Sequence, residues 1–261
     1  MAEKKKSCWL HGYGGPCRGK RNGEHYISRA LLEILAAGKT TAVLGGLPFQ
    51  APNTLEELGI NSLTTRIYCE GHNSGLSPLD TALAGVFRFV HLVNIEPDGA
   101  HPPRRFKGAL LERALLKVVV GVSAVERRKH LVPEQWKALL VGKGAWPQGH
   151  GLYLGRPADV QIHDGTFYYD AMLHPNTGTV AVASFFLAGI TLNLVLADIG
   201  DRDKFGIYRG RGYIFKHPDR DFRLELEWPH EPNECVVLTR IGTTEEPAPH
   251  ARGWKTMGIP R

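Results

Sequence analysis

The clearest helical pattern in the chain lies in its middle, over residues 104–140. Apolar side chains recur there at helical spacing, at Leu110, Leu111, Ala114, Leu115, Val118 and Val119. Pro102 and Pro103 stop any element before this segment. Pro133 opens a second short helix that ends near Gly142. The pattern therefore predicts a helical middle section.

After Lys143 the pattern changes to alternation, in a segment rich in Val, Thr, Phe and Tyr. The turn-forming sequences HDG and PNTG separate runs that are typical of strands. The longest apolar run, residues 180–197, lies mid-chain and contains polar residues, which favours a buried strand pair, or a strand and a helix, over a membrane span. We predict a mostly antiparallel β region over residues 150–242 and a loose tail from Thr243.

The first hundred residues differ from both regions, because they are rich in Cys, His and Gly and contain the short motifs. We therefore expect an α+β protein with two parts. Residues 1–100 form one predicted domain, and residues 101–261 hold the helical segment and a β-rich domain. The basic N-terminus has no apolar stretch behind it, so we expect no signal peptide and a cytoplasmic protein that is not bound to a membrane.

Composition excludes several classes of protein. The chain has 261 residues, of which 43% are hydrophobic and 22% charged, a globular balance that argues against collagen, low-complexity sequence and disorder. Its formal net charge of +6 permits contact with a phosphate backbone. Only four cysteines are present, and in a cytosolic protein so few indicate free thiols or a metal site.

Three of the four cysteines lie close to histidines in two short clusters. Cys8, His11 and Cys17 form the first cluster, and Cys69 and His72 form the second. Structural zinc takes four Cys or His ligands, usually as two short-spaced pairs from separate parts of the chain. Cys69 and His72 supply one pair. Cys8 with Cys17 is the favoured second pair, His11 is the alternate ligand, and unrelated buried thiols are the alternative to a zinc site.

The dipeptide Glu24–His25 lies between the two clusters. An imidazole with a near-neutral pKa can take a proton from water, and a neighbouring carboxylate can hold a divalent cation that stabilises charge on a phosphate. Such dipeptides are common at surfaces and helix caps, so the pair gains weight only from the Cys and His clusters on either side.

Taken together, the motifs resemble those of the HNH, or His-Me finger, endonucleases. The similarity covers residues 8–80: the sequence EHYIS resembles the acidic-His element at the end of the first strand of that family, and CEGHN resembles its closing zinc knuckle. The resemblance implies a zinc-stabilised treble-clef or ββα core. It also implies metal-dependent hydrolysis of nucleic acid, with DNA as the expected substrate.

The resemblance also implies roles for individual residues. His25 would be the general base and Glu24 a ligand of a catalytic Mg²⁺ or another divalent cation. Asn73 would orient the loop that bears His25. Cys8, Cys17, Cys69 and His72 would hold structural zinc, with His11 as the alternate ligand.

Two departures from the family pattern favour an alternative. The family's third catalytic element, in the closing helix, is missing; Asp80 could replace it, but Pro78 is expected to interrupt a helix there. The insertion between His25 and Cys69 is long, and either forms its own helix and hairpin or marks a decayed core. The alternative function is a non-catalytic zinc module that binds nucleic acid or protein.

Two further groups of residues have less specific patterns. Basic residues in the middle segment could follow a phosphate backbone or form a solvated helix face: Arg104, Arg105, Lys107, Arg113, Lys117, Arg127, Arg128 and Lys129. The C-terminal histidines, without metal-ligand spacing, are predicted to be turn residues: His150, His163, His174, His217 and His230.

Overall fold

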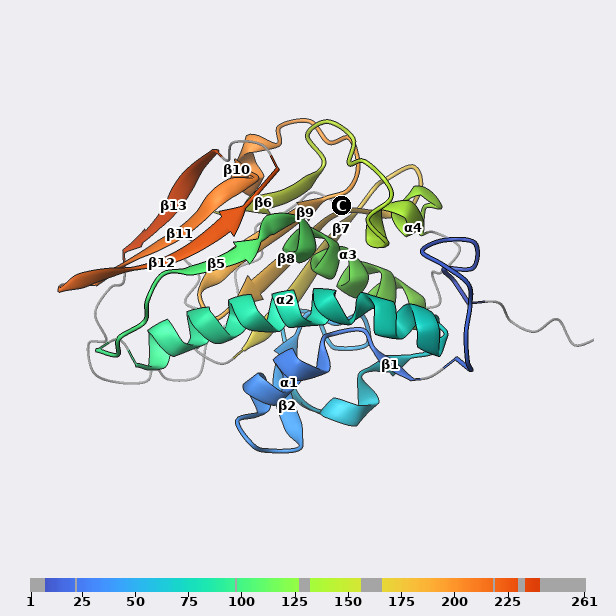
Figure 1. Ribbon diagram of the computed structural model, residues 1–261, viewed down its shortest axis with the longest axis horizontal. Helices are drawn as coiled ribbons and strands as arrows, with labels where there is room; N and C mark the ends of the chain where they lie inside the picture. Colours follow the sequence, from blue (N-terminus) through green and yellow to red (C-terminus); the bar gives the residue numbers. More distant parts are fainter. Residues whose placement is uncertain are drawn as a thin grey trace, which may run out of the picture.

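The computed structural model describes residues 8–21, 23–96, 98–126, 132–155, 166–217, 219–229 and 233–239. The predicted tail from Thr243 and the basic residues 127–129 lie outside these ranges. Helices and strands both contribute substantially, so the predicted α+β class is confirmed (Figure 1).

The elements follow one another in two halves. The first half contains β1 (Glu24–His25), α1 (Arg29–Ala36), β2 (Thr41–Gly45), β3 (Leu55–Gly59), η1 (Ile60–Ser62), β4 (Thr64–Thr65), α2 (Glu70–Ile95), β5 (Arg104–Lys107) and α3 (Gly108–Val125). The second half contains α4 (Gln135–Leu140), β6 (Gly151–Leu154), β7 (Phe167–Leu173), β8 (Val180–Leu187), β9 (Ile190–Val195), η3 (Asp203–Phe205), β10 (Ile207–Tyr208), β11 (Gly210–His217), β12 (Arg220–Glu227) and β13 (Asn233–Thr239).

Within the described residues, the largest sheet has seven strands in the order β10-β6-β9-β8-β7-β2-β3. All its neighbours pair antiparallel except β2 and β7, which are parallel. The central strand β8 is buried along almost its whole length. Burial on both faces explains the continuous apolar run at residues 180–197, which forms the predicted strand pair, β8 and β9.

A second sheet has the order β13-β11-β12-β5 and is mixed. β11 pairs antiparallel with β12 and parallel with β13, while β12 pairs parallel with β5. The prediction of a helix from residue 104 is therefore wrong at its start, since Arg104–Lys107 is a strand. The helix begins only at Gly108.

Helix α3 is the central helix of the core. Most of its residues are buried, on all sides of the helix, as expected for a helix enclosed by other elements. The polar side chains of Glu112 and Lys117 are buried with it and have charged partners. The sequence allowed Lys117 to lie on a solvated basic face. The structure buries it instead.

Helix α2 is the longest of the described helices and packs along α1 and α3 (Figure 1). It continues through Pro78, so the predicted interruption is wrong. Proline lacks the N–H that would bond to the carbonyl of Ser74. The Ser77 hydroxyl donates to that carbonyl instead, at 2.9 Å, and satisfies the acceptor that the proline leaves open.

Among the described helices, α2 alone has the length and apolar composition of a membrane span. Half of its apolar window is buried inside the protein.

The long stretch between His25 and Cys69 forms its own helix, α1, and hairpin, β2–β3, which is one of the two predicted outcomes. The hairpin joins the large sheet through β2 and β7. The predicted boundary at residue 100 thus runs through the large sheet, because β2 and β3 lie before it and the strands that they join lie after it.

Candidate metal centre and a neighbouring ion cluster

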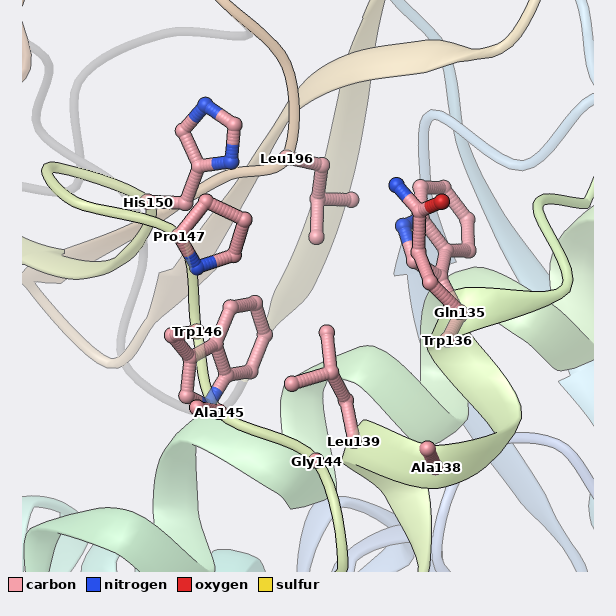
Figure 2. A pocket seen from close by; sticks show the side chains of 10 residues that line it. All are labelled: Gln135, Trp136, Ala138, Leu139, Gly144, Ala145, Trp146, Pro147, His150 and Leu196. Carbon is pink, nitrogen blue, oxygen red and sulfur yellow. The ribbon is translucent and has the colours of Figure 1, made fainter.

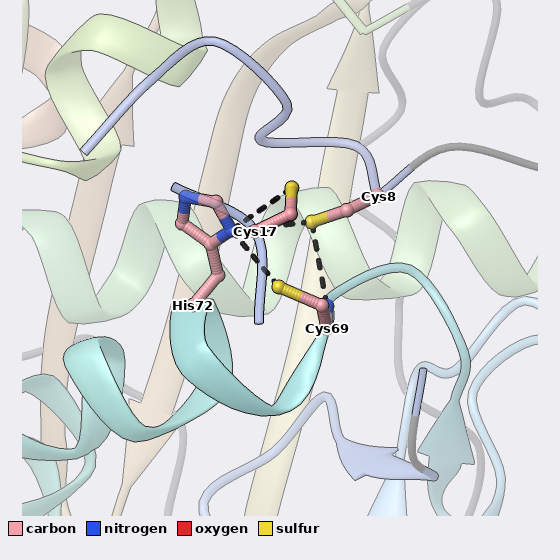
Figure 3. A group of neighbouring side chains, drawn as sticks. All are labelled: Cys8, Cys17, Cys69 and His72. Atoms are coloured by element: carbon pink, nitrogen blue, oxygen red, sulfur yellow. Dashed lines mark hydrogen bonds between the residues drawn. The ribbon is translucent and has the colours of Figure 1, made fainter. Parts of the chain in front are cut away.

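Four predicted zinc ligands converge at the N-terminal end of α2 (Figure 3). The ligand atoms of Cys8, Cys17, Cys69 and His72 all lie within 4.8 Å of one another. The Nδ1 atom of His72 is 3.4, 3.7 and 3.1 Å from the sulfurs of Cys8, Cys17 and Cys69, respectively. Tetrahedral zinc bonded to sulfur and nitrogen requires such separations to be about 3.5 Å. The side chains therefore suit a tetrahedral ion of zinc's size.

The local fold explains how two distant segments meet. Cys69 is the residue before α2, and His72 lies in the first turn of that helix. The N-terminal segment runs beside the residues that precede α2, where the Trp9 N–H donates to the Ile67 carbonyl at 2.8 Å. The Cys69 N–H donates to the sulfur of Cys8 at 3.3 Å. These contacts hold Cys8 next to the start of the helix.

A turn that contains glycines brings Cys17 back to the other three candidate ligands. Gly14 has a φ of +69°, and a Cβ there would lie 2.9 Å from a methyl carbon of Val141. Only glycine suits both this left-handed conformation and this close approach. The chain then bonds to the open N–H groups of α2, because Glu70 donates to the Lys20 carbonyl and Gly71 to the Arg18 carbonyl.

The orientation of His72 suits a metal ligand. Its Nε2 atom lies 2.6 Å from the carbonyl oxygen of Tyr13, which can only accept a hydrogen bond. Nε2 therefore bears the hydrogen, and Nδ1 directs its lone pair toward the three sulfurs. A backbone carbonyl that fixes the tautomer in this way is a common feature of zinc-binding histidines.

The three thiols titrate unequally. Burial raises the pKa of Cys8, and desolvation with the neighbouring Cys8 and Cys69 raises the pKa of Cys17 to about 11. Burial also opposes ionisation of Cys69, but hydrogen bonds with the backbone of His72 and Arg18 outweigh it and lower its pKa to about 6. Mutual repulsion disfavours three thiolates at this distance unless a cation neutralises them.

The predicted alternate ligand, His11, lies outside the group of four. Its Nδ1 atom is 3.6 Å from the sulfur of Cys17, so it approaches a single member of the cluster at the exposed edge. Cys17 completes the group of four.

The predicted catalytic carboxylates also come together, but with a lysine between them. The ammonium of Lys117 forms an ion pair with Glu24 and lies 2.9 and 2.8 Å from the two oxygens of Asp80. The side chains of Lys117 and Glu24 are each 3% exposed, against 28% for Asp80. A positive charge thus lies where a catalytic cation was expected.

His25 lies beside this ion cluster, and its neighbours affect its charge. Burial, followed by the nearby positive charge of Arg29, lowers the pKa of His25, which favours the neutral imidazole. Among the described residues, His25 Nε2, Glu24 Oε2 and the Tyr68 hydroxyl are buried without a hydrogen-bond partner. Asn73 has no side-chain hydrogen bond to the His25 segment within the described chain, and its N–H bonds to the Cys69 carbonyl in α2.

Lys117 is the main residue of this cluster that the sequence did not single out for the site. It lies in an apolar stretch of α3, where an isolated charge must be paired when buried. The apolar sequence around Lys117 is the only sequence signal that this lysine has a charged partner. It does not indicate which residues the partners are.

Comparisons of the chain with protein-family models, with curated proteins and with solved structures gave no match.

Proposed function

We propose that the protein is a zinc-stabilised module that binds nucleic acid. The observation that supports the metal is the closed group of four ligand atoms, three sulfurs and one imidazole nitrogen. Four protein ligands leave no open position for a substrate, so the proposed zinc is structural. It fixes the N-terminal segment against the start of α2.

The order of the elements supports a treble-clef-like arrangement around this ion. The Cys8–Cys17 turn comes first, the antiparallel pair β1–β4 follows, and α2 begins at the second pair of ligands. In the proposed module the zinc links the N-terminal segment to the start of α2, beside side chains that already belong to the main hydrophobic core.

The proposed partner is nucleic acid, with DNA as the first candidate. Exposed Arg18, Lys20 and Arg66 lie on the segments that surround the start of α2. Such cations bind phosphates with little sequence preference and release counterions, so the affinity falls with salt.

DNA binding tests this part of the proposal. Titrating a fluorescent duplex in increasing salt should give a linear fall of log affinity with log salt, and the double variant Arg18→Ala, Arg66→Ala should reduce the slope by about 2. Arg223→Ala, at an exposed position of β12, is the matched control and should leave the slope unchanged. Wild-type protein that binds no duplex at low salt contradicts the proposal.

A second candidate function is hydrolysis of a nucleic-acid phosphodiester. The observation that favours it is that Glu24, His25 and Asp80, chosen from the sequence, are neighbours in space. In this reaction neutral His25 takes a proton from water, the water oxygen bonds to phosphorus, and the bond to the leaving sugar oxygen breaks as that oxygen takes up a proton from solvent. Positive charge for the phosphate would come from Lys117, or from Mg²⁺ held by the two carboxylates.

A plasmid assay tests hydrolysis. Cleavage should be lost in His25→Ala while the zinc content stays that of wild type. His174→Ala, on an exposed turn, should cut normally. Activity without added divalent cation assigns the charge to Lys117, and activity only with Mg²⁺ assigns it to the metal. Wild-type protein that never cuts, with Mg²⁺ or Mn²⁺, removes this second function and leaves the binding module intact.

A further inference from the structure

A cavity of about 350 Å³ lies between α4 and one end of the large sheet (Figure 2). At this end β6 begins at Gly151 and pairs with Val195, the last residue of β9. His150 directly precedes β6, and Leu196 directly follows β9, so both side chains lie at the cavity. Helix α4 forms the opposite wall, and the loop that follows it lines the side next to His150 with Trp146 and Pro147 (Figure 2). Small-molecule sites in proteins have volumes of about 300–1,000 Å³.

The residues that line the cavity favour a neutral, planar ligand. Trp136 and Trp146 supply aromatic surface, and Leu139 and Leu196 supply aliphatic surface. No Lys, Arg, Asp or Glu is among the described residues that line the cavity. An anionic or cationic group would lose its hydration there without gaining a counter-charge, which is costly. Indole rings favour planar ligands because they can stack on them.

His150 provides a fixed hydrogen-bond acceptor at one side. Its Nε2 atom lies 3.2 Å from the carboxylate of Asp198, which also binds the guanidinium of Arg202. Because that carboxylate accepts, Nε2 bears the hydrogen, which leaves Nδ1 as the acceptor of the ring. Among the described residues Nδ1 has no partner, and Figure 2 shows a ring nitrogen on the side of the cavity.

The backbone around His150 is also held in place. The hydroxyl of Tyr208 donates to the carbonyl of His150 at 3.1 Å, and the hydroxyl of Tyr153 donates to the carbonyl of Gly149 at 2.9 Å. A side chain fixed through its ring and its backbone is preorganised for a ligand. The sequence predicted His150 to be a turn residue, and the structure also places its ring in the lining of the cavity.

Gln135 supplies a second polar group, at the mouth of the cavity. Its side chain is exposed, and Figure 2 shows its amide across the cavity from His150. An amide both donates and accepts hydrogen bonds, so it can pair with the polar edge of a heterocycle.

We propose that this cavity binds a neutral planar heteroaromatic ring, which packs against the indoles, donates a hydrogen bond to His150 Nδ1 and pairs with the Gln135 amide. The class includes nucleobases, either free or within a nucleic acid. The proposal depends on neither the zinc site nor the ion cluster, so it can fail without affecting the proposed function.

NMR of the indole N–H groups tests binding directly. The chain has five tryptophans, and Trp→Phe variants assign their signals. Adenine, uracil and indole are the neutral probes, and indole-3-acetate is the anionic one. At least one neutral probe should shift the signals of Trp136 and Trp146, saturating below about 1 mM, with Trp9 and Trp228 unmoved. Indole-3-acetate should bind at least about tenfold more weakly than indole.

Three variants test the site. Gln135→Ala should weaken the best nucleobase probe about five- to tenfold, as should His150→Phe, which keeps a ring but removes the acceptor. Gln148→Ala changes the same residue type on the adjacent loop, outside the lining, and should bind as wild type. Leu139→Trp should fill the cavity and abolish binding. Wild-type circular dichroism in each variant excludes unfolding as the cause.

The source of the ring is tested with a short single-stranded oligonucleotide. Shifts of the same two indoles at lower concentration than adenine requires indicate a base within a nucleic acid. Shifts with free bases alone indicate a small molecule. The proposal is overturned if no neutral probe moves Trp136 and Trp146, or if Gln135→Ala and Gln148→Ala bind equally well.

Discussion

Lys117 determines how the carboxylates of Glu24 and Asp80 behave. Burial raises the pKa of Glu24, and the charge of Lys117 opposes that rise. An ion pair this deep gains little net stability over apolar side chains, but it becomes costly when one partner is removed. The lysine is therefore required for as long as Glu24 is ionised.

Replacing Lys117 with Met should destabilise the protein by about 3–5 kcal/mol at neutral pH, because Glu24 is left buried without its counter-charge. Urea unfolding measures this loss. The deficit should shrink as the pH falls toward 5. A raised pKa means that the folded state binds the proton more tightly than the unfolded state, so protonation of Glu24 stabilises the folded variant.

The matched control for this substitution is Lys216→Met. Lys216 pairs with Asp221 at the surface, where its side chain is 47% exposed, so we expect a change within about 0.5 kcal/mol. Equal losses in the two variants, or a Lys117→Met deficit that does not change with pH, would contradict the role given to Lys117.

At the scale of residues, short spacings in the sequence predicted the group of candidate metal ligands correctly. Ion pairs and hydrogen bonds between distant residues could not be predicted. Cys69 and His72 were assigned because their spacing belongs to one helical turn. Glu24 and Asp80 were expected to belong to one site, but Lys117, which pairs with both, reaches them from α3, 37 residues after Asp80. Asp198, which orients His150, lies 48 residues from it. No local pattern specifies such partners.

At the scale of elements, α2 shows how a local side chain rescues a helix that contains proline. Pro78 leaves the Ser74 carbonyl without a backbone donor, and the Ser77 hydroxyl bonds to it. The general rule for proline predicted an interruption because it considers the backbone alone. The hydroxyl next to the proline is the signal that could have corrected it.

A double-mutant cycle tests this account. Ser77→Ala should cost about 0.5–1 kcal/mol in the wild type and close to nothing in a Pro78→Ala background, where the backbone N–H of residue 78 bonds to Ser74. Thr81→Ala is the control, because its hydroxyl bonds to the Ser77 carbonyl, away from the gap. Additive effects of Ser77→Ala and Pro78→Ala in urea unfolding would refute the rescue.

Other strands could be predicted from the sequence when the strand that they pair with is close to them along the chain. The strand pair β8–β9 is a hairpin within one apolar run, so its sequence is sufficient. Strand β5 was missed because its partner, β12, lies more than a hundred residues later. Its sequence, RRFK, has no alternation that separates it from the start of the following helix.

At the scale of the whole molecule, sheets join segments that the sequence pattern separated. β2 and β3 extend the sheet of the C-terminal strands, and β5 extends the second one. Helix α2 packs on α1 and α3, and the second pair of candidate metal ligands lies at its N-terminal end. The proposed zinc would thus connect the start of the chain to a helix of the core.

The identity and coordination of the metal test the central claim most directly. Elemental analysis of protein purified without a histidine tag should give one zinc per chain, and X-ray absorption should give three sulfurs at about 2.3 Å and one nitrogen at about 2.0–2.1 Å. His11→Ala should keep the metal, and Cys69→Ser should lose it. Protein without zinc, or a shell in which His11 replaces Cys17, would contradict the assignment of Cys8, Cys17, Cys69 and His72.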